Sequence, residues 1–362
     1  MAKFEGVKWA PRQMRYLLPA KQFDILEADA KVYGVSRSIF YATFLSFEGI
    51  RFFVKKTTKG QLEVVFLNWH KNLERLQRGM AFNLSKSQAG LIPAVEEMES
   101  IIVHQYFKEP PVRAFLAEMA EAGAQGYLRP FTVDEEQSMG VTFPSQPSLR
   151  AAFCRYDNYL GEPFTGVVIP HLVRASSANK TGCLKLGINY LISLKAMEAA
   201  KEVDPQAAAA LFLDDRTYLP LEDRHITEWD SSCCLFGFRD GTVVKIPESD
   251  LILPSVTIQG MVGLLREMGV KVEERHLKYG ELTDRVKAND LVVVASIGTA
   301  GIMNRCQKLL CVDRANAVAT THVPDVGHPL YAQLADAKAR YWDIYKEKAP
   351  LAAGMRLFKY VL

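Results

Sequence analysis

The sequence predicts an α/β (α+β) protein of two domains. The chain has 362 residues, which exceeds the roughly 250 to 300 at which a single hydrophobic core stops growing. Strand-like and helix-like apolar patterns both recur along it, and residues 138–148 are rich in Ser, Pro and Gly. We therefore expect an N-terminal α/β domain over residues 1–150, an interdomain linker over 151–160 and a C-terminal domain over 161–362.

The composition is that of an ordinary globular protein. Hydrophobic residues make up 49% and charged residues 23%, and the net charge is only +3, so no nucleic-acid partner is indicated. The six cysteines and seven histidines lack the spacing of a disulfide scaffold or a zinc site, which favours a reducing compartment and no metal. Pro11 lies where a signal peptide would be apolar, and residues 291–303 are too short to span a membrane. We expect a cytoplasmic protein with no membrane partner.

The first half of the chain reads as a sheet followed by helices. Residues 39–47, 50–54 and 62–67 are β-rich runs between polar breaks, which predicts antiparallel strands. Leu73, Leu76, Met80 and Leu84 then recur at helical spacing, so an amphipathic helix follows. Two more helices are expected over 94–107 and 112–122, and another strand over 126–130.

The second half mixes both element types. Asp240-Gly241 separates two apolar runs and predicts a hairpin of 233–238 with 242–246, because this pair tolerates positive φ. A helix is expected to begin just after Pro254 and to end before Gly269. The remaining expected elements are a helix over 188–203 and strands over 209–213 and 291–295.

Lys185 is the first candidate catalytic residue. It lies between Leu184 and Leu186 and just before Gly187, where partial desolvation would favour the free amine as a nucleophile and then as a base. Such an amine can form a Schiff base with the aldehyde of pyridoxal phosphate. Tyr190 could reach the phenolic oxygen of that cofactor. The ordinary explanations are a solvated lysine and a half-buried tyrosine.

Three further segments suit other parts of the same cofactor. Glu228 could hold the pyridine nitrogen protonated, which makes the ring an electron sink. Ser255-Val256-Thr257 at a helix start, and Gly298-Thr299-Ala300 after an apolar strand, could present N–H groups to the phosphate. Alone, these would be an edge-strand acid, a capped helix and a small-residue turn. Together and in this order, they predict a pyridoxal phosphate site.

Three other residues could bind anions. Arg75 could pair with the phosphate, although a solvated helix charge is the simpler explanation. Tyr127 and Arg129 are two residues apart on a predicted strand, so both project from one face, and this suits a substrate carboxylate. A structural arginine packed under the sheet is the alternative for Arg129.

The order of these motifs resembles the class IV (fold type IV) pyridoxal phosphate-dependent aminotransferases, and most closely the branched-chain amino acid aminotransferases. The resemblance spans nearly the whole chain. It is carried by Phe47-Glu48-Gly49-Ile50-Arg51, Asn72-Leu73-Glu74-Arg75-Leu76, Tyr127-Leu128-Arg129-Pro130, the K-x-G-x-N-Y segment from Lys185 to Tyr190, Glu228, the L-P-x-V-T turn at 253–257 and the G-T-A turn at 298–300.

The resemblance implies two α/β domains with pyridoxal 5'-phosphate between them, and a homodimer in which a loop of the partner chain, Ser138-Met139-Gly140-Val141, closes each site. It implies that Lys185 is the Schiff-base lysine, with Glu228 on the ring nitrogen and Tyr190 on the phenolic oxygen. The implied phosphate ligands are Arg75, Val256, Thr257 and Thr299. The implied substrate-binding residues are Phe47, Tyr127, Arg129, Thr299, Ala300, Met139 and Val141.

The implied function is transamination of an L-amino acid with an apolar, branched-chain-like side chain to its 2-oxo acid, with 2-oxoglutarate as acceptor. Four alternatives stay open: a fold type IV lyase such as aminodeoxychorismate lyase, a D-amino acid aminotransferase, a specialised biosynthetic aminotransferase with another amino acid, and a cofactor-less binding protein. Cys154-Arg155-Tyr156-Asp157-Asn158, where the family is usually apolar or aromatic, puts polar groups near the substrate side.

Overall fold

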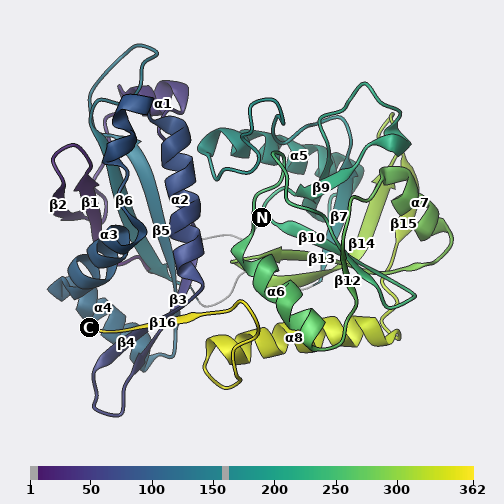
Figure 1. The fold of residues 1–362 in the computed structure, drawn as a ribbon. Coiled ribbons are helices and arrows are strands. Elements are labelled where there is room, and N and C mark those ends of the chain that lie inside the picture. Colours follow the sequence, from purple (N-terminus) through teal and green to yellow (C-terminus); the bar gives the residue numbers. More distant parts are fainter. Residues whose placement is uncertain (1–6, 157–162) are drawn as a thin grey trace. The chain divides into compact units, whose positions relative to one another are not determined.

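The computed structural model of the chain describes residues 7–156 and 163–362, which form two compact units (Figure 1). The N-terminal unit contains the residues up to 156 together with 184–188 and 356–362. The C-terminal unit contains 163–183 and 189–355. Helices and strands mix in both, as expected for an α/β protein. In the described ranges, no helix combines the length and the hydropathy that crossing a membrane would need.

The N-terminal unit is built on a seven-stranded sheet in the order β16-β4-β3-β5-β6-β1-β2, in which every neighbouring pair is antiparallel. Its strands are β1 (Arg12–Leu17), β2 (Gln22–Glu27), β3 (Ile50–Lys56), β4 (Leu62–Leu67), β5 (Gln125–Asp134), β6 (Pro147–Arg155) and β16 (Leu357–Val361). Its helices are α1 (Arg37–Tyr41), α2 (Trp69–Asn83), α3 (Val95–Glu99) and α4 (Pro110–Glu121), with a π-helix at Ser100–Gln105 and 3-10 turns at Lys86–Leu91 and Tyr106–Lys108.

Aromatic side chains fill the core between this sheet and its helices. The Phe52 ring lies 5.5 Å from Phe66, 5.5 Å from Phe107 and 5.4 Å from Phe153, measured between ring centroids. Gly126 on the neighbouring strand is required here, because a Cβ at this position would lie 2.0 Å from the Phe52 ring. The core thus dictates a glycine in the middle of a strand.

Most elements predicted for this unit are confirmed, and two differ. The 50–54 and 62–67 strands pair antiparallel as β3 and β4, and the helix predicted from Leu73 onward is α2. The strand predicted at 39–47 is wrong: Ser36 accepts the Ile39 amide N–H as an N-cap, and α1 forms instead. Residues 151–155, expected in the linker, form the second half of β6 because Ala151 and Phe153 are core residues. Residues 157–160 lie outside the described ranges.

The C-terminal unit contains a mixed nine-stranded sheet in the order β12-β11-β10-β13-β14-β7-β8-β9, with β15 paired to β14. The bounds are β7 (Phe164–Ile169), β8 (Ala207–Leu213), β9 (Ile226–Trp229), β10 (Cys233–Phe238), β11 (Val243–Lys245), β12 (Val272–Glu274), β13 (Leu291–Gly298), β14 (Ile302–Val312) and β15 (Val318–His322). The helices are α5 (Tyr190–Val203), α6 (Val256–Glu267), α7 (Tyr279–Lys287) and α8 (Pro329–Tyr345), with a 3-10 turn at Leu221–Asp223. A further 3-10 turn at Gly187–Asn189 begins in the segment 184–188 that belongs to the N-terminal unit.

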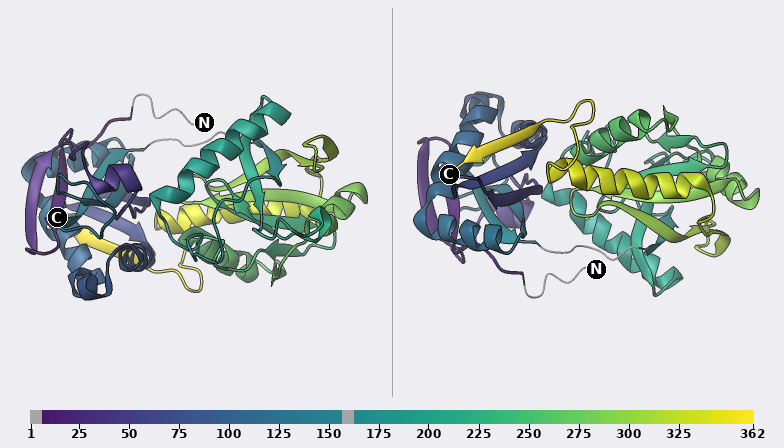
Figure 2. Two further views of the ribbon diagram at one scale, coloured as in Figure 1. Left: turned by 90° about the horizontal axis from the view of Figure 1, so that it is seen from above. Right: turned by 90° about the horizontal axis from the view of Figure 1, so that it is seen from below.

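Helices cover this sheet in two groups. Helix α5 packs on β7 and β8 around Val167, Ala196 and Phe212, whereas α6 and α8 lie side by side and both contact β13 (Figure 2). The predicted hairpin is confirmed as β10 and β11, with Gly241 at a φ of 84°. The predicted helix after Pro254 is confirmed as α6.

Candidate functional site

Lys185 is held in the N-terminal unit by backbone pairing with the FEGIR segment. The Phe47 amide N–H donates to the Lys185 carbonyl at 3.1 Å, and the Gly187 N–H donates to the Leu45 carbonyl at 2.9 Å. The Lys185 Nζ lies 5.1 Å from the centre of the Phe47 ring, and the side chain is half-buried. Two antiparallel hydrogen bonds therefore fix the lysine backbone, and an aromatic face contacts its amine.

Arg129 and Tyr127 lie at the same ring. The Arg129 guanidinium carbon is 4.9 Å from the Phe47 ring centre and 5.1 Å from that of Tyr127, and its Nη2 donates to Tyr127 Oη at 3.3 Å. Both side chains project from one face of β5, as their two-residue spacing predicts. The structure thus brings together Lys185, Phe47, Tyr127 and Arg129. It juxtaposes two cationic groups and a phenol, which is a donor set for an anionic ligand.

Arg75 lies on α2 and forms a two-point ion pair with Glu48, a carboxylate that the sequence motifs did not single out. Its Nε and Nη2 donate to the two oxygens of Glu48 at 2.6 and 2.7 Å, and Asn72 Nδ2 adds a third bond at 3.1 Å. Both partners are buried. Burial raises the pKa of the Glu48 carboxyl, but Arg75, Lys185 and Asn72 more than offset it and leave that pKa below its usual value.

Glu228 lies on β9 in the C-terminal unit and is also in a buried ion pair. Its carboxylate pairs with Arg174 Nη2 and accepts the Leu253 amide N–H at 3.2 Å. Arg174 Nη2 also contacts the carbonyls of Gly182 at 2.8 Å and Leu251 at 3.0 Å. Arg174 therefore connects Glu228 to Gly182, which lies three residues before Lys185 in the chain.

The two turns that were predicted to bind an anion both belong to the C-terminal unit. Ser255 caps α6, so Val256 and Thr257 occupy its first turn, where backbone N–H groups have no partner within the helix. Thr299 and Ala300 lie in the turn between β13 and β14 and are half-buried. Cys233 connects the pieces, since it pairs with Ile297 in the ladder and its Sγ lies 3.5 Å from the Leu253 carbonyl and 4.0 Å from Glu228 Oε2. Tyr190 begins α5 and is half-buried.

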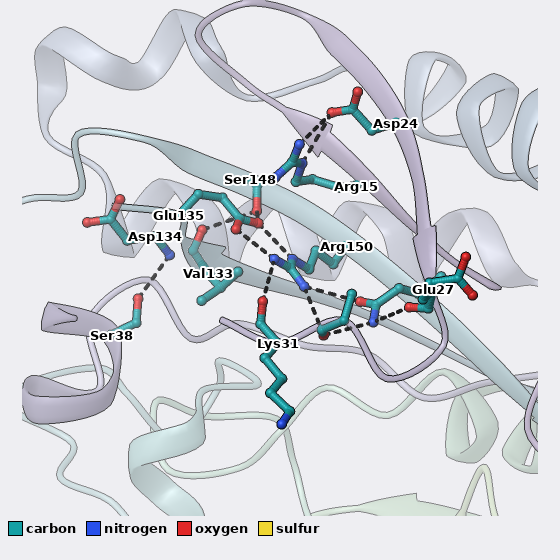
Figure 3. Close-up of polar contacts among 12 residues, drawn as sticks. Arg15, Asp24, Glu27, Lys31, Ser38, Val133, Asp134, Glu135, Ser148 and Arg150 are labelled. Carbon is teal, nitrogen blue, oxygen red and sulfur yellow. Dashed lines mark hydrogen bonds and ion pairs between the residues drawn. The ribbon is translucent and has the colours of Figure 1, made fainter. Parts of the chain in front are cut away.

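Met139 and Val141 lie on the loop between β5 and β6 of the N-terminal unit and are 74% and 79% exposed. Buried polar contacts anchor the start of this loop (Figure 3). Arg150 donates to both oxygens of Glu135 at 2.7 and 2.6 Å, and Ser38 Oγ accepts the Asp134 amide N–H at 3.0 Å. The loop thus has a rigid base and presents apolar side chains to solvent.

Sequence reasoning missed Glu48 and Arg174. Glu48 was visible, because it lies inside the FEGIR segment, but its task depends on a pairing with Arg75 across 27 residues. Arg174 follows a buried strand without any distinguishing local pattern. Each of the two is the buried ion-pair partner of a residue that lies in one of the motifs, Arg75 or Glu228.

Comparison with known proteins identifies the family. Residues 46–300 match the family model "Amino-transferase class IV". A "Probable branched-chain-amino-acid aminotransferase" of Staphylococcus aureus (strain N315) is 25% identical over 289 residues, which cover 79% of this chain and 74% of that protein.

Solved structures share the fold. The branched-chain aminotransferase from Thermoproteus uzoniensis with norvaline has a TM-score of 0.68 at 19% identity, over 95% of this chain and 96% of that one. An aminotransferase from Brucella abortus bound to the co-factor PLP has a TM-score of 0.62 at 17% identity, over 92% and 99% of the two chains. The predicted fold class and family are thereby confirmed. The chain is an enzyme that belongs to the class IV aminotransferase family.

Proposed function

We propose that the protein is a pyridoxal 5'-phosphate-dependent transaminase that converts an L-amino acid with an apolar, branched-chain-like side chain to its 2-oxo acid, with 2-oxoglutarate as acceptor. The main support for the proposal is the clustering of Lys185, Tyr127 and Arg129 around the Phe47 ring in the N-terminal unit. The names of the relatives support the branched-chain preference.

The residues present fit the cofactor. Its phosphate needs cations and backbone N–H groups, which Arg75, the first turn of α6 at Val256 and Thr257, and Thr299 would supply. Its ring nitrogen needs an anion, and Glu228 is a buried carboxylate held by Arg174 and by the Leu253 N–H. Tyr190 would contact the phenolic oxygen. When bound, the cofactor supplies an electron sink for the bond that breaks at the substrate α-carbon.

The chain's own groups would carry out the remaining tasks. Lys185 would bond to the cofactor aldehyde and, once displaced by substrate, would move the α-proton as a base and then as an acid. Tyr127 and Arg129, with the Thr299 and Ala300 backbone, would bind and orient the substrate carboxylate. The Phe47 ring would exclude water next to the amine and contact the apolar side chain.

We further infer a homodimer whose partner loop completes each site. Eight large apolar side chains are 44% to 79% exposed in two segments that contact each other, because Ser138 N–H donates to the Val35 carbonyl and Arg37 Nη1 to the Phe143 carbonyl. Exposed apolar patches of this kind mark protein interfaces. A second copy of the chain would cover them: Tyr33, Val35, Ile39, Phe40, Tyr41, Met139, Val141 and Phe143. A cytoplasmic location accords with six cysteines whose spacing is not that of a disulfide scaffold.

The proposal is tested by trapping the lysine. Purified protein incubated with pyridoxal 5'-phosphate and reduced with borohydride should carry the label on Lys185, as shown by peptide mapping. Lys185→Ala should lose the label and at least a thousandfold of the transaminase activity, by analogy with the loss of other catalytic residues. The matched control is Lys195→Ala, on the exposed face of α5, which should keep both. A label on another lysine would refute the assignment.

The substrate class is tested separately with a panel of L-amino acids added to the loaded protein. Leucine, isoleucine and valine should convert the cofactor to its amine form. If only polar amino acids do so, the substrate class is wrong although the transaminase assignment stands. Formation of pyruvate without an oxo-acid acceptor would indicate a lyase instead.

A further inference from the structure

The FEGIR segment contains a carboxylate to which the proposed function gives no task. We propose that Glu48 is a positioning residue that fixes the plane of the Arg75 guanidinium and acts as a shared buried counter-ion for Arg75 and Lys185. This inference rests on the proposed function, in which Arg75 binds the cofactor phosphate and Lys185 its aldehyde.

Glu48 is built as a permanent anion. Its side chain is fully buried, and both of its oxygens accept hydrogen bonds: Oε1 from Arg75 Nε, and Oε2 from Arg75 Nη2, Asn72 Nδ2 and, at 3.3 Å, the Gly49 amide N–H. A bidentate pair with two parallel N–H bonds allows the guanidinium one plane only. The orientation of Arg75 therefore depends on Glu48.

The same segment places this charge beside the lysine. Glu48 directly follows Phe47, whose amide N–H binds the Lys185 carbonyl and whose ring lies under the Lys185 Nζ. The Lys185 ammonium, after Arg75, helps to hold the pKa of the Glu48 carboxyl below its usual value. The Arg129 guanidinium faces the same Phe47 ring. Three cationic side chains thus lie at residues 47–48: Arg75 pairs with Glu48, and Lys185 and Arg129 face the Phe47 ring.

Removing the charge of Glu48 and removing that of Arg75 should have opposite effects on the Lys185 amine. Without the Glu48 charge, the positive charge of Arg75 would no longer be neutralised and would disfavour the Lys185 ammonium, so the free amine would persist to lower pH. Without the Arg75 charge, Glu48 would attract the ammonium unopposed, so the free amine would appear only at higher pH. A residue that merely packs the core would produce neither shift.

The test uses the full-length protein freed of cofactor and pyridoxal, the aldehyde without the phosphate. Imine formed at each pH is trapped with cyanoborohydride, and the Lys185 peptide is quantified by mass spectrometry. Glu48→Gln should lower the pH of half-maximal labelling by about one unit, and Arg75→Met should raise it by about one unit. The matched control is Glu135→Gln, which breaks the comparable buried pair with Arg150 in the same unit and should leave the midpoint unchanged.

The outcomes separate the inference from the proposed function. If the wild-type label does not lie on Lys185, the proposed function fails. If it does, but the Glu48→Gln midpoint equals that of the wild type or moves no further than that of Glu135→Gln, the inference is overturned. Should Glu48→Gln not fold, the double variant Glu48→Gln with Arg75→Met has a neutral pair and is expected to fold. The labelling midpoint of this double variant should lie between two limits: one pH unit below the wild-type midpoint, and the midpoint of Arg75→Met. A midpoint equal to that of Arg75→Met would overturn the inference.

Discussion

At the scale of single residues, two buried arginine–glutamate pairs organise the candidate site, one in each unit. Arg75 pairs with Glu48 and Arg174 with Glu228. Removing one member of such a pair leaves an uncompensated charge and costs about 3 to 5 kcal/mol. In each pair the motifs predicted one member and missed the other. Local sequence patterns reveal chemistry at fixed spacing, whereas the partner of a buried charge is chosen by the tertiary fold.

His322 gives a pH dependence of stability. It ends β15, is 4% exposed, and its Nε2 has no hydrogen-bond partner in the described part of the chain. Burial lowers the pKa of its imidazole to about 4. The unfolded imidazole titrates near pH 6.5, so the unfolded state takes up the proton first as the pH falls. We expect the free energy of unfolding to decrease by up to about 3 kcal/mol between about pH 6.5 and pH 4 from this residue alone.

The measurement is urea unfolding as a function of pH. His322→Leu should remove this part of the decrease, whereas His104→Leu, on an exposed position of the π-helix, should leave it in place. Identical pH profiles for the wild type and His322→Leu would contradict the assignment.

At the scale of elements, β16 completes the N-terminal sheet from the far end of the chain. It pairs with β4 from Leu357 to Val361, and Tyr360 Oη accepts a hydrogen bond from Trp69 Nε1 at 3.1 Å. The Phe66 and Trp69 rings stack at 4.3 Å beside it. The expected C-terminal domain over 161–362 therefore does not hold its last strand, because an apolar edge on β4 binds it.

We predict that a chain ending at Met355 loses about 3 kcal/mol of stability in the N-terminal unit, since this removes one ladder and the cover of two aromatic rings. In the truncated chain, the backbone amides of β4 should exchange hydrogen faster than in the full-length chain. The amides of β8, in the other unit, should exchange at an unchanged rate. Val361→Ala, at a position that is 45% exposed, is the matched control and should leave β4 protected. Unchanged protection of β4 in the truncated chain would refute the role of β16.

Elements with strong local signals were predictable, and those set by distant contacts were not. Residues 62–67 form an almost unbroken apolar run rich in β-branched residues and aromatics, and Leu73, Leu76 and Met80 recur at helical spacing. The structure confirms the strand and the helix that these patterns predict. The apolar run at 39–47 suggested a strand, yet Ile39, Phe40 and Tyr41 are about half exposed on α1. Hydrophobicity alone does not distinguish a core strand from an exposed surface helix.

At the scale of the whole molecule, the exposed apolar side chains in 33–41 and 139–143 favour the formation of a dimer. We predict a dimer in solution, and Val141→Asp should raise its dissociation constant at least tenfold, because a carboxylate in an apolar interface must be desolvated. Val326→Asp, at a 68% exposed position of the C-terminal unit, is the matched control and should not change the dissociation constant.

Sedimentation velocity across a range of concentrations measures this constant for each variant. Activity should fall in parallel with dimer dissociation, because the loop of one copy is proposed to complete the site of the other. A monomeric wild type, or a Val141→Asp variant that dimerises normally, would exclude this face as the interface.

The placement of Lys185 and β16 also has a consequence for biosynthesis. The segment 45–47 acquires its partner strand only when residues 184–188 are available, and β4 acquires its neighbour only when residues 357–361 are available. In a nascent chain on the ribosome, the N-terminal sheet would therefore have an unpaired edge strand, which is prone to aggregation, throughout most of translation. The part made first would be finished last, and chaperone capture during synthesis would be directed at β4.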